Sequence, residues 1–160
     1  MLSIRAATVN DASLLCSLIR ELAEYERELH RVVIQEEDIV RDGFGPHPKF
    51  RALIADWEGK AAGYALFFTV YSTGQGKPGL FLEDIFVRPA FRKKGVGTAL
   101  LARVARLAQD EHCYGIRWEV LDWNQPAISL YESLGAKFLD QWRSAILSDG
   151  ALKSLAGQAP

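Results

Sequence analysis

The chain has 160 residues, 49% of them hydrophobic and 24% charged, and its net charge at pH 7 is −1. This composition is typical of a single globular domain spanning residues 1–160, and the near-zero charge argues against nucleic acid as a partner. The longest apolar run is about ten residues, too short to span a bilayer, so we expect no contact with a membrane. Cys16 and Cys113 show no metal or disulfide spacing, so we expect reduced thiols in a cytoplasmic protein.

The N-terminal half of the chain predicts a strand, two helices and a hairpin. Leu2–Arg5 reads as a short strand, and Val9–Glu28 carries apolar residues at helical spacing. A short acidic helix, Glu36–Asp42, should end at Gly43. Two apolar segments, Phe50–Asp56 and Ala61–Tyr71, flank a turn and predict a β-hairpin.

The next part of the chain predicts a crossover between two parallel strands. A glycine-rich loop, Gly74–Gly79, leads into Leu80–Val87, which is apolar enough for a strand buried on both faces. Val96–Glu111 has helical spacing, and Ile116–Leu121 predicts the following strand. Because a helix lies between the two strands, they should pair in parallel, with a ligand site at their carboxyl ends.

The C-terminal part predicts a helix, a strand and a tail helix. Ala127–Leu134 should form a helix that stops at Gly135. Trp142–Leu147 predicts a last strand, and Ser148 would cap a helix reaching Leu155. The order of all these elements argues for an α/β fold with a mixed central sheet flanked by helices.

A basic loop with two glycines follows Leu80–Val87 and precedes the Val96–Glu111 helix. Four cations lie within seven residues: Arg88, Arg92, Lys93 and Lys94. The unpaired backbone N–H groups at a helix start, together with its partial positive charge, suit a phosphate or pyrophosphate. The residues after Gly97 fit neither the P-loop nor the dinucleotide-binding pattern, so both nucleotide interpretations fail on spacing.

Arg92-x-x-Gly95-x-Gly97 resembles the coenzyme A-binding loop of the GNAT superfamily of N-acetyltransferases. The segment from Asn124 through Tyr131 to Gly135 resembles the second acetyl-CoA contact segment of the same superfamily. The resemblance implies a GNAT fold, with a sheet of about six to seven strands around a parallel β-α-β core that binds acetyl-CoA. A tight turn with a solvated basic rim is the structural alternative for the loop.

Four segments resemble the group that contains the spermidine/spermine and thialysine N-acetyltransferases. They are Glu21–Glu26, Asp42–Pro48, Leu82–Val87 and Trp123–Pro126. In this group acetyl-CoA contacts the end of one strand, the loop, and two residues farther along the chain. The corresponding residues here are Ile85, Phe86, Val87, Arg92, Lys93, Lys94, Gly95, Val96, Gly97, Thr98, Asn124 and Tyr131. The resemblance also implies a homodimer with acetyl-CoA as the cosubstrate, and because the histidines and cysteines show no metal-ligand spacing we expect no metal.

Two residues are candidates for acid–base chemistry on an amine acceptor. Glu83, a carboxylate inside an apolar strand, is the candidate base, acting directly or through water. Tyr131 is the candidate acid, because a phenol with a pKa near 10 can protonate a thiolate whose thiol pKa is about 8.5. Asp84 should point to the opposite face from Glu83 unless a bulge intervenes, and could pair with a backbone N–H or with Arg117.

The resemblance also implies that Tyr25, Glu26, Glu83 and Asp84 belong to the acceptor site, where the negative charge of the three acids suits a small cationic amine. Relatives that acetylate polyamines carry an aromatic residue in the loop after Tyr71, and this chain has none. That difference leaves thialysine, lysine-like amines and other diamines open as acceptors. Two alternatives remain, an acetyltransferase acting on a protein lysine or N-terminus, and a non-catalytic sensor of acyl-CoA.

Overall fold

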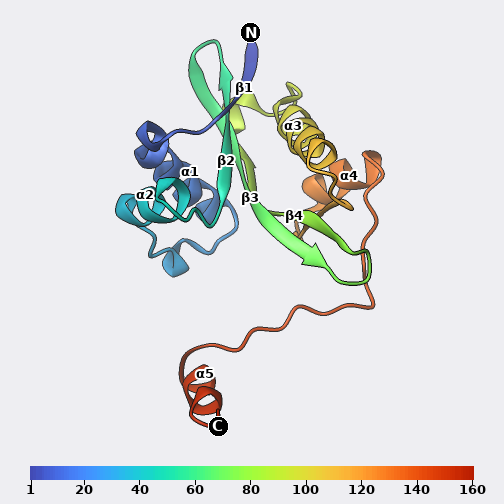
Figure 1. The fold of residues 1–160 in the computed structure, drawn as a ribbon. Helices are drawn as coiled ribbons and strands as arrows, with labels where there is room; N and C mark the ends of the chain where they lie inside the picture. Colours follow the sequence, from blue (N-terminus) through green and yellow to red (C-terminus); the bar gives the residue numbers. More distant parts are fainter. The chain divides into compact units, whose positions relative to one another are not determined.

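The computed structural model describes all 160 residues, which form two compact units, Met1–Leu121 and Asp122–Pro160. In the first unit a central sheet separates α1 and α2 on one side from α3 on the other (Figure 1). No helix is both long enough and apolar enough to cross a membrane.

The first unit contains a five-stranded mixed sheet, in the order β1-β2-β3-β4-β5. Its strands are β1 (Leu2–Ala6), β2 (Arg51–Trp57), β3 (Lys60–Ser72), β4 (Lys77–Val87) and β5 (Ile116–Trp118). Its helices are α1 (Ala12–Tyr25), α2 (Glu36–Phe44) and α3 (Val96–Asp110), with single 3₁₀ turns at Val9–Asp11, Leu29–Arg31 and Pro89–Phe91. Neighbours from β1 to β4 are antiparallel, and β4 pairs with β5 in parallel. The predicted α/β class and the parallel crossover are therefore confirmed.

The sheet has five strands, not the six to seven that we expected. The strand predicted at Ile116–Leu121 stops at Trp118, and Trp142–Leu147 forms no strand. By contrast, β4 is longer than predicted at its start, because Lys77–Gly79 pair with Val70–Ser72 and lengthen the hairpin of β3 and β4. The predicted loop at Gly74–Gly79 is thus shorter than expected.

Two glycines that the sequence suggested as breaks serve close packing instead. At Gly79 a Cβ atom would lie 2.4 Å from the ring of Tyr114, so the strand needs glycine to pass beneath that ring. At Gly43 a Cβ atom would lie 2.7 Å from the ring of Phe50. α2 runs through Gly43 to Phe44 and does not end at Gly43 as predicted.

Apolar side chains fill both faces of the sheet. On one face, residues of α1, α2 and the central strands form a buried cluster: Ala12, Leu15, Leu18, Ile39, Ala52, Ile54, Tyr64, Leu66 and Phe86. The buried face of α3 consists of Val96, Leu100, Leu101, Val104 and Ala108. Burying an aliphatic or aromatic side chain contributes roughly 1.5–3 kcal/mol, so these two layers fix how α1 and α3 lie against β4.

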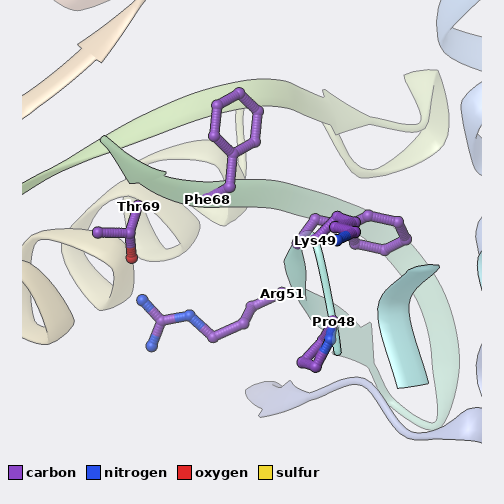
Figure 2. A pocket seen from close by; sticks show the side chains of 6 residues that line it. Pro48, Lys49, Arg51, Phe68 and Thr69 are labelled. Atoms are coloured by element: carbon purple, nitrogen blue, oxygen red, sulfur yellow. The ribbon is translucent and has the colours of Figure 1, made fainter. Parts of the chain in front are cut away.

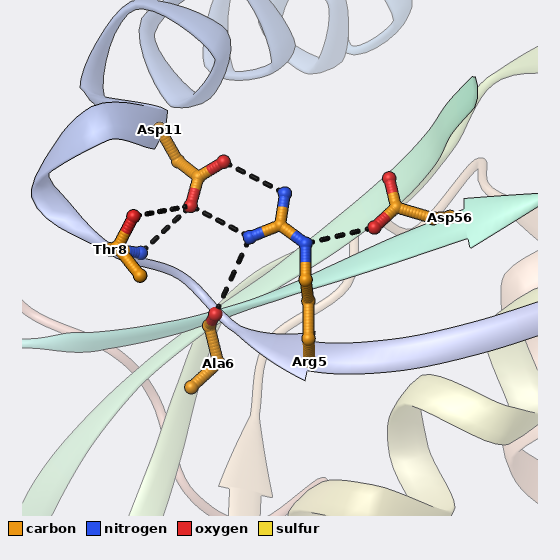
Figure 3. A network of polar contacts seen from close by, with 5 residues as sticks. All are labelled: Arg5, Ala6, Thr8, Asp11 and Asp56. Atoms are coloured by element: carbon orange, nitrogen blue, oxygen red, sulfur yellow. Dashed lines mark hydrogen bonds and ion pairs between the residues drawn. The ribbon is translucent and has the colours of Figure 1, made fainter. Parts of the chain in front are cut away.

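An ion-pair network ties the N-terminal strand to the elements beside it. Arg5 on β1 donates two hydrogen bonds of 2.8 Å to the carboxylate of Asp11, and its Nε donates to Asp56 on β2 at 2.9 Å (Figure 3). Asp11 also accepts the backbone N–H of Thr8, which closes the turn before α1. This pairing holds the pKa of Asp11 at about 2, below its ordinary 3.8, because hydrogen bonds from Arg5 favour the carboxylate.

The second unit contains two helices, α4 (Gln125–Ser133) and α5 (Asp149–Ala156). α4 starts two residues before the predicted Ala127, with a proline in its first turn. Gly135 has a φ of 86°, and this left-handed residue ends the helix as predicted. The apolar residues between the helices are exposed, for example Trp142 (73%) and Ile146 (90%), so in this unit they have no sheet face to cover.

Candidate active site

The candidate site begins where β4 loses one of its two neighbours. β5 pairs with β4 only from Leu80 to Leu82, whereas β3 stays with β4 as far as Val87. From Glu83 onward one edge of β4 has no strand beside it, and its outward backbone groups can hydrogen-bond a ligand. The predicted acetyl-CoA-binding residues Ile85–Val87 lie in this open stretch.

The start of α3 lies directly after this strand end. Gly95, the residue before the helix, has a φ of 80°, and Lys93 in the loop has a φ of 59°. No side chain caps the helix, and Ala99 is the first residue whose N–H reaches an intrahelical acceptor, the carbonyl of Gly95 at 2.9 Å. The N–H groups of Val96–Thr98 therefore remain available to an anion at the positive end of the helix dipole.

Three of the four cations around this loop have partners within the protein. Arg88 forms an ion pair with Glu21, with N–O distances of 2.6 and 2.8 Å. The ammonium group of Lys94 lies over two aromatic rings, 5.3 and 5.6 Å from their centres. Arg92 is stacked in a similar way, whereas Lys93 is exposed and forms no ion pair. The loop thus offers backbone N–H groups and Lys93 to a phosphate, not four free cations.

Arg92 contacts three structural elements at once. Its Nε donates a hydrogen bond of 2.9 Å to the carbonyl oxygen of Val87, at the end of β4. Its guanidinium lies 5.8 Å from the ring centre of Phe86, and it also covers the ring of Tyr25, the last residue of α1. The side chain is therefore held at the junction of the loop, β4 and α1.

Glu83 lies at a β-bulge. Leu66 on β3 is opposite Asp84, and Phe67 is opposite Leu82, so Glu83 has no partner across the strands. The bulge interrupts the strict alternation that we expected for two adjacent acids. The side chain of Glu83 forms no hydrogen bond or ion pair, and the residue is exposed. A bulge of this kind re-aims a side chain at a strand edge, as a base at a binding site requires.

Asp84 is joined to the core by a tyrosine and not by Arg117 or a backbone N–H. The hydroxyl of Tyr64 donates to Oδ2 of Asp84 at 2.9 Å. Burial raises the pKa of Asp84 to about 6, the bond from Tyr64 opposes that rise, and repulsion from Glu83 and Glu26 adds to it. Burial and the neighbouring acids likewise raise the pKa of Glu26. Glu26, Glu83 and Asp84 therefore act on one another electrostatically, and we call them the acid cluster.

A shallow pocket of about 370 Å³ lies elsewhere in the first unit, where β2 begins beside β3. It is lined by Pro48, Lys49, Phe50, Arg51, Phe68 and Thr69. The side chains of Arg51 and Thr69 extend to one side of β3 and the Phe68 ring to the other (Figure 2). Arg51 forms an ion pair with Glu111, so its charge is already compensated within the protein. None of the predicted site residues lines this pocket.

Comparison with known proteins decides the family. The sequence pattern of the acetyltransferase (GNAT) family matches residues 14–136. The chain is 39% identical, over 97% of its own length and 97% of the relative's, to a thialysine N-epsilon-acetyltransferase of Sus scrofa. The chain belongs to the acetyltransferase (GNAT) family. It is thus an N-acetyltransferase, and family membership implies acetyl-CoA as its cosubstrate.

Two further comparisons extend this result. An L-ornithine N5-acetyltransferase of Arabidopsis thaliana is 36% identical, over 80% of this chain and 53% of that protein. Among solved structures, an integron cassette protein from the mobile metagenome of V. cholerae superposes with a TM-score of 0.80. That protein is 21% identical over 97% of both chains, which supports the fold of this acetyltransferase.

Two predicted site residues of the acetyltransferase belong to the second unit. Asn124 immediately precedes α4, and Tyr131 lies within the helix and is 6% exposed. The backbone carbonyl of Tyr131 accepts the N–H of Ala136 at 3.0 Å, which fixes the end of the helix. The first unit brings together the acid cluster, the loop before α3 and the open edge of β4. The roles of Asn124 and Tyr131 remain predictions.

Sequence reasoning missed the two contacts that organise this acetyltransferase site. Tyr64 lies in a strand that reads as uniformly apolar, so its hydroxyl bond to Asp84 was not foreseen. Arg92 was assigned to phosphate binding, and its stacking on Tyr25 was also not foreseen. A tyrosine in a fully buried run is the one signal that the sequence offered, since a buried phenol needs a hydrogen-bond partner.

Proposed function

We propose that this acetyltransferase transfers an acetyl group from acetyl-CoA to the primary amine of a small cationic acceptor, by direct attack in a ternary complex. The acceptor class that we favour is thialysine or another lysine-like diamine, with polyamines as further candidates. The observation that carries this proposal is the acid cluster beside the open edge of β4. The relatives named for thialysine and L-ornithine support the same class of acceptor.

The cosubstrate would be held mainly by backbone groups. In this proposal the open edge at Ile85–Val87 hydrogen-bonds the amide-containing arm of acetyl-CoA, as an added strand would. The N–H groups of Val96–Thr98 and the charge of Lys93 would bind its pyrophosphate. The uncapped first turn of α3 supports this assignment, because no side chain competes for those N–H groups. Asn124 would add a further contact.

Deprotonation of the acceptor is the step that needs a base. An alkylammonium has a pKa of about 10.4, so at pH 7 only about one molecule in 10³ is the neutral nucleophile. Glu83, exposed and without a partner of its own, would take the proton, directly or through a water molecule. Glu26 and Asp84 would attract the cationic acceptor, and Tyr25 would pack against its carbon chain.

The departing thiolate needs a proton once the amine has attacked. We assign this step to the hydroxyl of Tyr131, because a phenol can donate to a thiolate of coenzyme A. The proposed reaction then uses Glu83 as the acceptor of one proton and Tyr131 as the donor of another. No group of three or more His, Cys, Asp or Glu side chains is arranged to hold a metal ion, and the proposed steps use none.

We further propose that both units form one domain and that the enzyme is a cytoplasmic homodimer. The family match at residues 14–136 supports one domain, because it crosses the boundary after Leu121. The free thiols of Cys16 and Cys113 support a reducing compartment. Exposed apolar side chains of the second unit, such as Ile146, support self-association. Light scattering coupled to size-exclusion chromatography tests the dimer directly.

The test of the acceptor is an assay of thiol release at about pH 8, where free amine is less scarce. The enzyme would be mixed with acetyl-CoA and thialysine, lysine, ornithine, putrescine, spermidine, spermine or a lysine-containing peptide. We expect release with one or more of the small amines. Release with the peptide alone would point to a protein acetyltransferase, and binding of acetyl-CoA without release from any amine would point to a sensor.

A further inference from the structure

A buried tyrosine supports the acid cluster from inside the sheet. Tyr64 on β3 has no exposed surface and belongs to the apolar cluster that α1 and α2 cover. Its hydroxyl donates a hydrogen bond of 2.9 Å to Oδ2 of Asp84. Phenylalanine would fill the same apolar space, so packing alone does not require the hydroxyl. The hydroxyl of Tyr64 therefore acts on the site through its hydrogen bond to Asp84.

The surroundings of Asp84 otherwise oppose its negative charge. Glu83 lies beside it on β4 and Glu26 comes from the end of α1, and both repel a carboxylate at this place. Burial disfavours the charge as well, and the bond from Tyr64 is the one interaction that opposes these effects on the Asp84 pKa. Arg92 supplies positive charge to this region, where its guanidinium is stacked on aromatic rings.

We propose that Tyr64 is a positioning residue, whose hydroxyl keeps Asp84 ionised and oriented so that the acid cluster binds the cationic acceptor near neutral pH. This inference rests on the proposed function, because it takes the ligand of the cluster to be a cationic amine. When several carboxylates act on one another, the most buried one takes up a proton most readily. The hydrogen bond from Tyr64 moves that protonation to lower pH and leaves the cluster charged when the acceptor arrives.

The test measures binding of a cation whose charge does not change with pH. Turnover is a poor readout, because the acceptor amine itself titrates near pH 10. The probe is therefore the trimethylammonium analogue of the best acceptor found in the thiol-release assay. Its dissociation constant from the coenzyme A complex would be measured by calorimetry from about pH 5 to 9, across the range where Asp84 titrates. The proteins compared are the wild type, Tyr64→Phe and Tyr71→Phe.

We expect wild-type affinity to fall below about pH 6, as Asp84 becomes protonated. A hydrogen bond to a charged group corresponds to roughly one to two pKa units, so in Tyr64→Phe this fall should begin about one pH unit higher. Binding at pH 6 should then be weaker by about fivefold, with no difference at pH 9. Tyr71→Phe removes an exposed hydroxyl from the same strand and should match the wild type.

Two results would overturn the inference. One is an affinity of Tyr64→Phe for the probe that depends on pH as the wild-type affinity does. The other is a loss of affinity of the same size at every pH, as a purely structural effect would give. If Tyr64→Phe does not fold, the same measurement is made on Asp84→Asn. A fall in affinity near pH 6 that persists in Asp84→Asn would mean that another group titrates there, and it would overturn the inference. A wild-type enzyme that acetylates none of the amines would refute the proposed function before any variant is compared.

Discussion

The guanidinium of Arg92 lies 4.7 Å from the centre of the Tyr25 ring. Arg92 belongs to the loop that starts α3, whereas Tyr25 ends α1 and is followed directly by Glu26 of the acid cluster. A single side chain thus links the residues predicted to bind acetyl-CoA with those predicted to bind the acceptor. The hydrogen bond from Arg92 to Val87 adds the open edge of β4 to the same contact.

Replacing Arg92 should therefore affect both substrates. We expect Arg92→Lys to raise the KM for the amine by about fivefold, because an ammonium loses both the planar stacking on Tyr25 and the bond from Nε. The KM for acetyl-CoA should rise as well, since the loop is no longer held against β4. Initial-rate kinetics with each substrate varied in turn measures both constants.

Lys93→Ala is the matched control for this experiment. Lys93 is the neighbouring cation, it is exposed, and it makes no contact with α1 or β4 through an ion pair or an aromatic ring. Removal of the Lys93 side chain should raise the KM for acetyl-CoA and leave the KM for the amine unchanged. If Arg92→Lys behaved like Lys93→Ala, the stacked contact would have no part in the acceptor site.

Glu83→Gln should lower kcat by about 10² to 10⁴, the usual contribution of a general base. The loss should be greatest at low pH, where the unprotonated amine is scarcest, and should shrink as the pH approaches about 10. A pH–rate profile of wild type and variant checks this expectation. Glu24→Gln, which changes an exposed acid on α1, should leave the profile unaltered. Parallel wild-type and Glu83→Gln profiles would place the base at another residue.

Most of the fold could be predicted from local patterns in the sequence. The hairpin of β2 and β3 followed from two apolar segments flanking a turn, and the helix α3 followed from helical spacing, because each pattern is complete within its own element. The prediction of a strand at Trp142–Leu147 was wrong for a physical reason. Apolar residues show that a segment can cover a surface, but they do not supply a strand with which it can pair.

The candidate site was predictable as a set of residues but not as a geometry. The loop around Gly95 could be found because two glycines and four cations stand between a strand pattern and a helix pattern. The bulge at Glu83 depends on the register between β3 and β4, which no local pattern encodes. Tyr64, the partner of Asp84, and Tyr25, on which Arg92 is stacked, come from segments 20 or more positions away, so these two contacts could be identified only from the folded chain.

Gly97→Asp should separate cosubstrate binding from stability. A carboxylate in the first turn of α3 interacts favourably with the helix dipole, so we expect the melting temperature to be unchanged or slightly raised. The same charge would repel the pyrophosphate at the N–H groups of Val96–Thr98, and acetyl-CoA binding should be lost. Calorimetry and thermal unfolding measure the two effects. Gly150→Asp, in the first turn of α5 where an added Cβ atom meets nothing within 4 Å, is the control, and retained binding in Gly97→Asp would mean that the pyrophosphate lies elsewhere.

The pair of Arg5 and Asp11 should make the stability of the enzyme depend on pH. Because the pKa of Asp11 is about 2 in the folded protein and 3.8 ordinarily, its contribution is fully present above about pH 4 and is lost as the pH falls toward 2. Arg5 is 43% exposed, so we expect Asp11→Asn to lower the free energy of unfolding at pH 7 by about 1–2 kcal/mol. The difference from wild type in urea unfolding should shrink at pH 3. Asp110→Asn, which breaks an exposed pair with Arg106, should change stability by less than about 0.5 kcal/mol at either pH. A difference for Asp11→Asn that stayed constant with pH would show that its cost comes from the lost turn before α1 and not from the ion pair.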